Sequence, residues 1–214
     1  MIGVWLILGV CRFLEKQMKI NDAHDLLLKY VTSPTLQRHC LTVSVVLKYW
    51  AESLGEPDPE FWECVGLLHD IDFEQFPDEH CKKAKDILES EKANFPEITD
   101  ELIHAVQSHG WNICCDVQPV HRMEKVLYTI DELTGLIFAC AMARPSRSVM
   151  DLEVKSVTKK FKTPAFAAGC SREVISNGME LMKAVIPAID NNEIINRCIL
   201  AMRTQASALG VGTM

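Results

Sequence analysis

The histidine–aspartate pair His69-Asp70 directly follows an apolar run. The chain adds three histidines, His39, His80 and His109, and the aspartate Asp131 at spacings that suit a metal site. Imidazole and carboxylate groups together bind Zn, Fe, Mn, Co or Ni, and a bound cation lowers the pKa of a coordinated water toward neutrality. A histidine–aspartate pair alone is common at helix ends, so the prediction of a hydrolytic metal site depends on the accompanying residues.

Periodic apolar residues predict the helices that must carry these side chains. The best signalled helix covers residues 35–53, because Ser33 is a good N-cap, Pro34 suits a first helical position and Gly55 follows its end. His39 shares the apolar face of this helix. The same reasoning predicts helices over residues 22–30, 60–68, 79–92, 99–108, 122–143, 152–160, 171–185 and 190–206. No run of alternating β-branched residues occurs, so we expect an all-α, single-domain helical bundle.

The other histidines lie near the ends of expected helices. His69 ends the helix over 60–68, His80 falls in the first turn of the helix over 79–92, and His109 ends the helix over 99–108. Helix ends converge in bundles, where facing side chains build metal sites. Each imidazole taken alone has an ordinary reading, as a buried group bonded to backbone or as a surface residue. Their combination favours a metal site.

Asp131 lies in the middle of the apolar helix expected over 122–143. Its neighbours along the same helix face, Leu127 and Gly135 at one turn and Met123 at two turns, favour an inward position, whereas the alternative is a carboxylate that faces solvent. A buried, unpaired carboxylate is costly. A bound metal would remove that cost.

At these positions the chain resembles the HD superfamily of metal-dependent phosphohydrolases. The resemblance covers about residues 35–145. Within the superfamily, the chain looks most like the small predicted HD hydrolases. The resemblance is carried by the motifs Arg38-His39, Gly66–Asp70, Glu79-His80, Ser108–Gly110 and Asp131–Leu133.

The resemblance implies a helical HD-type domain with two divalent metal ions, which would be Fe, Mn, Mg, Zn, Co or Ni. Asp70 would bridge the two cations and act as the catalytic residue that orients the attacking water. One cation would be held by His39, His69 and Asp131, and the other by His80 and His109.

The resemblance further implies hydrolysis of a small phosphorylated substrate, either a phosphomonoester or a phosphodiester, such as a nucleotide or another metabolite. Residues Ile71–Phe73 replace the Gly and Lys that follow the pair in HD-GYP phosphodiesterases, and no Gly-Tyr-Pro motif follows His109. Cyclic dinucleotides are therefore not the expected substrate. The cations that would neutralise phosphate are expected elsewhere. The candidates are Arg38, Arg144, Lys159, Lys162 and Arg172, each of which is otherwise ordinary surface charge.

Two alternatives to hydrolysis remain open from the sequence. The same ligand set resembles di-iron HD oxygenases, in which an iron pair activates dioxygen. The other alternative is a non-catalytic module that senses a nucleotide, although an intact ligand set argues against it. Metal analysis separates the first alternative from hydrolysis, and turnover assays separate the second.

The net charge of the 214-residue chain is −7 and is unevenly distributed. Residues 144–183 carry +4, residues 184–214 are balanced, and residues 1–143 carry −11. This acidic body argues against general nucleic-acid binding but not against a nucleotide, because bound cations offset local carboxylate charge.

The nine cysteines form no Cys-x-x-Cys pair, which predicts reduced thiols in a cytoplasmic protein. The apolar stretch over residues 1–14 lacks a basic n-region and is too short to span a bilayer. Three readings of residues 1–18 stay open: a packed N-terminal helix, a weak membrane-associating segment, or an N-terminal extension from a mis-assigned start. The last is favoured, with Met18 as the natural initiator, because residues 19–22 look like a polar entry into a first helix. Residues 19–214 are read as one HD-type domain. The oligomeric state is left open.

Overall fold

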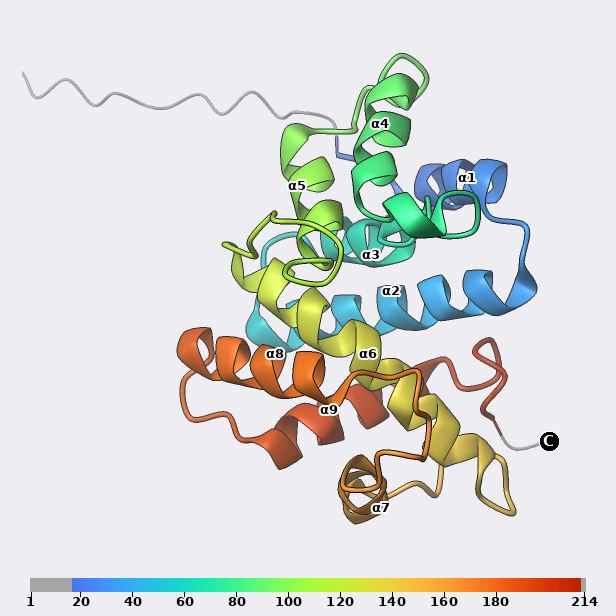
Figure 1. Ribbon diagram of the computed structural model, residues 1–214, viewed down its shortest axis with the longest axis vertical. Coiled ribbons are helices and arrows are strands. Elements are labelled where there is room, and N and C mark those ends of the chain that lie inside the picture. The colour runs from blue at the N-terminus through green and yellow to red at the C-terminus, as the bar shows by residue number, and fades with distance from the viewer. Residues whose placement is uncertain (1–16, 213–214) are drawn as a thin grey trace, which may run out of the picture.

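The computed structural model describes residues 17–212, and within this range the protein is all-helical, as the sequence predicts (Figure 1). Its only β feature there is an isolated bridge between Trp111 and Cys115. The elements are α1 (Ile20–Tyr30), α2 (Pro34–Leu54), α3 (Pro59–Leu68), the 3₁₀-helix η1 (Pro77–Glu79), α4 (Lys82–Glu91), α5 (Asp100–Ser108), α6 (Arg122–Met142), α7 (Val154–Phe161), α8 (Arg172–Val185) and α9 (Asn191–Thr204).

The helix boundaries follow from local capping chemistry. The Ser33 side chain accepts a hydrogen bond from the Leu36 N–H at the start of α2, which ends at Gly55 in the left-handed conformation with φ of 68°. Asp58 caps α3 in the same way through the Phe61 N–H. The starts of the helices that carry His39 and His69 are thus determined by residues only a few positions away.

Helices α2 and α6 lie at the centre of the bundle and position the other elements (Figure 1). Helix α2 packs against α3, α6 and α9, and α6 also packs against α8. In Figure 1, α4 and α5 lie at one end of the molecule and α7 lies at the other. On α2, the predicted inward face is confirmed, because Val43, Val46 and Trp50 are fully buried.

Helices α2 and α3 approach each other closely at Gly66. A Cβ atom at this position would lie 2.8 Å from the Cα of Ser44, a separation that real structures do not allow. The backbone of Gly66 therefore needs a residue without a side chain. This close approach brings the helix that carries His39 next to the helix that ends at His69.

The prediction of one helix over residues 79–92 is wrong at its start. The chain first forms the short helix η1, passes through His80 with φ of −50° and ψ of 146°, and then reaches Cys81 at φ of 65° before α4 begins at Lys82. His80 thus lies between two helices, not in a first helical turn. The carboxylate of Asp72 explains why the helix is interrupted here, because one of its oxygens contacts the His80 ring and the other accepts from the Ala84 N–H.

Most of the N-terminal extension expected over residues 1–18 lies outside the described residues. Met18 is described, and its side chain is 1 % exposed within the core. In the described part of the chain, no helix has both the length and the apolar character needed to cross a membrane. The cysteines of that part are all free thiols, as the sequence predicts.

Candidate metal centre

Separate elements bring the predicted ligands together. His39 projects from the second turn of α2 and Asp131 from the middle of α6. His69 and His109 are the residues at which α3 and α5 end. The pair of short elements η1 and α4 contributes the connecting residue His80. Residues that are far apart in the sequence therefore meet at one point inside the bundle.

The first group of side chains surrounds one oxygen of Asp131. His39 Nε2 lies 2.9 Å and His69 Nε2 lies 3.3 Å from Asp131 Oδ1, and the two imidazole nitrogens are 3.2 Å apart. The Oδ2 atom of Asp70 faces the same group, at 3.6 Å from His39 Nε2 and 3.4 Å from His69 Nε2. Two imidazoles and two carboxylates thus share one small volume.

The second group lies on the opposite oxygen of Asp70. Its Oδ1 atom is 3.4 Å from His80 Nε2 and 3.4 Å from His109 Nε2, and these two nitrogens are 3.0 Å apart. Asp70 therefore lies between two imidazole pairs and presents one oxygen to each.

The orientation of the rings leaves nitrogen lone pairs pointing into both groups. The Nδ1 atoms of His69 and His109 contact the backbone carbonyls of Gly66 and Val106, and carbonyls can only accept. These Nδ1 atoms must therefore carry the hydrogen, which leaves each neutral ring with an Nε2 lone pair. His80 holds its Nδ1 against the carboxylate of Asp72 in the same way. Acceptors that converge this closely repel one another unless a cation lies among them, so the donor set fits a metal.

The electrostatics of the centre also favour bound positive charge. Burial lowers the pKa of His39, but its hydrogen bond to Asp131 and the charges of Asp131 and Asp70 outweigh burial and raise this pKa to about 9. Burial and the carboxylate of Asp70 act in the same opposing senses on His109, and its pKa also rises to about 9. The imidazoles of His69 and His39 hold the pKa of Asp70 low despite burial. In the absence of a metal, protons take the place of the cations.

A pH dependence follows for the metal-free protein. A raised histidine pKa stabilises the fold fully below the unfolded value of 6.5 and loses this contribution as the pH rises to about 9. We therefore expect the free energy of unfolding of the metal-free protein to fall between pH 6.5 and 9, and we expect metal affinity to rise over the same range as protons leave. Denaturant titrations with and without Mn²⁺ measure both trends. A metal-free stability that increases over this window would contradict the assignment.

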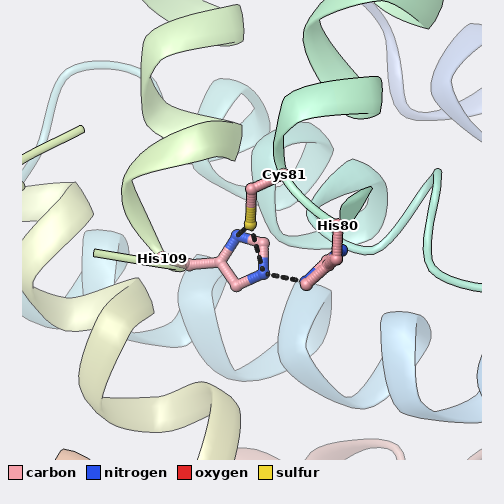
Figure 2. A group of neighbouring side chains, drawn as sticks. All are labelled: His80, Cys81 and His109. Carbon is pink, nitrogen blue, oxygen red and sulfur yellow. Dashed lines mark hydrogen bonds between the residues drawn. The ribbon is translucent and has the colours of Figure 1, made fainter. Parts of the chain in front are cut away.

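Cys81 also lies close to His109 and His80 (Figure 2). Its Sγ is 3.7 Å from Nε2 and 3.9 Å from Nδ1 of His109, almost equally far from both ring nitrogens. The sulfur therefore does not lie along the lone pair of Nε2. It contacts Cys114 Sγ instead, at 3.3 Å. We assign Cys81 to the packing around His109 and not to the ligand set.

Asp72 is the residue of this centre that sequence reasoning missed. It is fully buried, and its carboxylate accepts from His80 Nδ1 at 2.8 Å and from the Ala84 N–H at 2.8 Å. It thereby fixes both the ring orientation of His80 and the start of α4. The only sequence signal for Asp72 is its position two residues after Asp70, in the segment that leads to His80. This position does not by itself predict a contact between the two side chains.

If His80 and His109 hold a cation, we expect Asp72→Asn to weaken the binding of that cation selectively. Removal of a carboxylate that orients a ligating histidine costs about 10- to 100-fold in metal affinity. Metal titration by calorimetry should therefore show one affinity reduced and the other retained. Asp78→Asn, at an exposed position of η1, is the matched control and should leave both affinities unchanged. Equal weakening of both cations by Asp72→Asn would contradict this role.

The candidate phosphate-binding cations are not gathered at the centre. Arg144 forms an ion pair with Asp151, and the guanidinium of Arg172 donates to the carbonyls of Ala167, Cys170 and Phe166. Lys159 and Lys162 line a surface cavity between α7 and the start of α9.

Arg38 differs from these four residues. It lines a cavity that also borders His39, so it lies beside the candidate metal centre. Of the five cations, Arg38 therefore remains the strongest candidate for contact with a substrate.

Within the described residues, the helices of an all-α bundle bring four histidines and two aspartates to one internal point, and this donor set could hold a metal ion. Comparison with family models gives the more particular result: residues 36–134, a little under half of the chain, match the HD domain. Residues 36–134 are therefore similar to the HD domain. Searches of curated proteins and of solved structures gave no significant match.

Proposed function

We propose that this protein is a metal-dependent hydrolase of a small phosphomonoester or phosphodiester, such as a nucleotide or another phosphorylated metabolite. The observation that carries the proposal is the position of Asp70. Its two oxygens face two separate groups of imidazoles at 3.4 to 3.6 Å. This is the arrangement that two divalent cations bridged by one carboxylate require.

In this proposal His39, His69 and Asp131 would hold one cation, His80 and His109 would hold the other, and Asp70 would be available as a ligand to both. When bound, the two cations supply an activated water and positive charge for the phosphoryl oxygens. The chain itself supplies orientation. Asp72 and the carbonyls of Gly66 and Val106 hold the hydrogen on Nδ1 of three rings, so their Nε2 atoms stay available.

Turnover under defined metals tests this function. The metal-free protein should be reloaded separately with Mn²⁺, Mg²⁺, Co²⁺ or Ni²⁺ and assayed with p-nitrophenyl phosphate, bis(p-nitrophenyl) phosphate and a panel of nucleoside monophosphates. We expect hydrolysis of at least one ester that depends on added metal and is lost with a chelator. No turnover with any metal would overturn the proposal.

The two alternatives have distinct outcomes. A di-iron oxygenase would contain about two irons per chain as purified, give a mixed-valent spectroscopic signal and hydrolyse none of the esters after reloading. A sensor would gain thermal stability with a nucleotide and show no turnover. We also propose a cytoplasmic location, which is supported by the free thiols of the described residues.

A further inference from the structure

Among the described residues, the candidate metal centre is most accessible at His39 and Asp131, whose side chains are 29 % and 20 % exposed. The side chains of the other candidate ligands are less exposed: 0 % for His69, 3 % for His109, 11 % for Asp70 and 13 % for His80. A substrate can therefore approach where α2 and α6 face each other, at His39 and Asp131.

A cavity of about 290 Å³ lies on this open side and borders His39. All of its lining residues come from α2 and α6, the helices that carry the two exposed ligands. Besides His39 these residues are Thr35, Arg38, Thr42, Thr134, Gly135 and Phe138. The cavity is thus continuous with the candidate centre.

Two of the three threonine hydroxyls that line the cavity are not free to donate to a ligand. The hydroxyl of Thr42 donates to the Arg38 carbonyl at 2.7 Å, and the hydroxyl of Thr134 donates to the Asp131 carbonyl at 2.9 Å. Both hydroxyl hydrogens are therefore used within their own helices. Gly135 contributes no side chain, and Phe138 contributes an aromatic ring. A cavity of this kind favours an apolar or aromatic group over a polyhydroxylated sugar.

Arg38 adds a flat cation to the same wall. Its guanidinium carbon lies 5.3 Å from the ring centroid of Phe138, and it has no carboxylate partner among the described residues. Other arginines of the chain are neutralised by carboxylates: Arg122 by Glu56, Arg144 by Asp151 and Arg197 by Glu193. The guanidinium of Arg38 is thus free to stack on a ring or to contact an anionic group.

We propose that this cavity binds the organic group of the substrate ester, and that this group is compact and apolar or aromatic. Phe138 and Arg38 then form the wall that selects it, while the phosphoryl group faces His39 and Asp131. This inference rests on the proposed function, because it assumes that the candidate centre acts on a phosphate ester. It identifies Phe138 as a residue that determines specificity without touching the reacting phosphorus.

Binding of phosphonates tests the cavity independently of turnover, because their carbon–phosphorus bond is not hydrolysed by this chemistry. The full chain loaded with Mn²⁺ is titrated by calorimetry with phenylphosphonate and with methylphosphonate. We expect phenylphosphonate to bind at least about tenfold more tightly, because its ring buries apolar surface in the cavity. Phe138→Ala should remove this preference and leave the affinity for methylphosphonate and the metal content unchanged.

Two further variants separate recognition from folding. Phe138→Leu keeps an apolar side chain packed against the core, so it should fold and retain part of the preference. Phe95→Ala is the matched control, because Phe95 also carries a cation over its ring, Lys29 at 4.7 Å, but belongs to the turn after α4. It should leave the preference unchanged.

Three results would overturn the inference: equal affinities of the two phosphonates for the wild-type protein, no binding of phenylphosphonate, or equal weakening of both by Phe138→Leu. The proposed function fails separately. Selective phosphonate binding without hydrolysis of any ester would retain the cavity and reject the hydrolase. Ester hydrolysis without selectivity would retain the hydrolase and reject the cavity.

Discussion

Replacement of Asp70 by asparagine is expected to abolish hydrolysis and to weaken both cations at once. Asparagine keeps the shape of the side chain but replaces one carboxylate oxygen with an NH₂ group, which cannot bind a metal. Loss of the shared ligand removes several kcal/mol of charge stabilisation in the transition state, which corresponds to a decrease of at least ~10³-fold in kcat/KM. Metal content after desalting and turnover of the best ester measure the two effects.

The same variant has a second signature in the metal-free protein. The charge of Asp70 helps to hold the pKa of His39 and His109 at about 9, so Asp70→Asn should lower both values. Titration of these rings by NMR detects this shift without any activity. Asp78→Asn, on the exposed surface of η1, is the control and should change neither the metals nor the titration. Full metal content in Asp70→Asn would contradict the bridging position.

Separate loss of each cation is the second large effect expected. His109→Gln should remove the cation held with His80, and His39→Gln should remove the cation held with His69 and Asp131. Each variant should retain about one metal per chain, because the other group of ligands remains complete. We expect kcat to decrease by about 10²-fold or more in both, since each cation stabilises charge on the phosphoryl group.

His104→Gln is the matched control for these histidine variants. His104 is also a histidine and lies on α5, but its Nδ1 pairs with Glu124 Oε1 at 2.7 Å instead of joining the candidate centre. Its side chain is 41 % exposed. Its replacement should leave two cations bound and activity unchanged. If His109→Gln and His39→Gln each lost both metals, the two groups would form a single site, and the two-cation assignment would be wrong.

Much of the fold could be predicted because its signals are local. The start of α2 is determined by Ser33 and Pro34 and its end by Gly55, so residues within one turn carry the information. The failure at residues 79–92 has a tertiary cause. Asp72 bonds both His80 and the Ala84 N–H, and this contact from an earlier segment interrupts the helix that the local pattern favours.

In the candidate site, too, the residues with a local sequence signal could be predicted and those that depend on tertiary contacts could not. Asp131 was conspicuous because a carboxylate on an apolar helix must be satisfied, and the structure places its oxygen 2.9 Å from His39. The role of Asp72 was not visible, because an aspartate in a loop is ordinary in any sequence. Similarly, Arg172 was an ordinary candidate for phosphate until the structure placed its guanidinium on three backbone carbonyls. Unlike a helix cap, a guanidinium that donates to loop carbonyls leaves no sequence pattern.

Metal stoichiometry tests the central claim most directly. The full-length chain, freed of metal, reloaded with Mn²⁺ and desalted, should be analysed by inductively coupled plasma mass spectrometry against protein concentration. Two ions per chain in the wild-type protein, with fewer than one in Asp70→Asn, is the result expected for two cations that share the Asp70 carboxylate. One ion or none in the folded wild-type protein would contradict the two-metal centre and the hydrolytic function proposed from it.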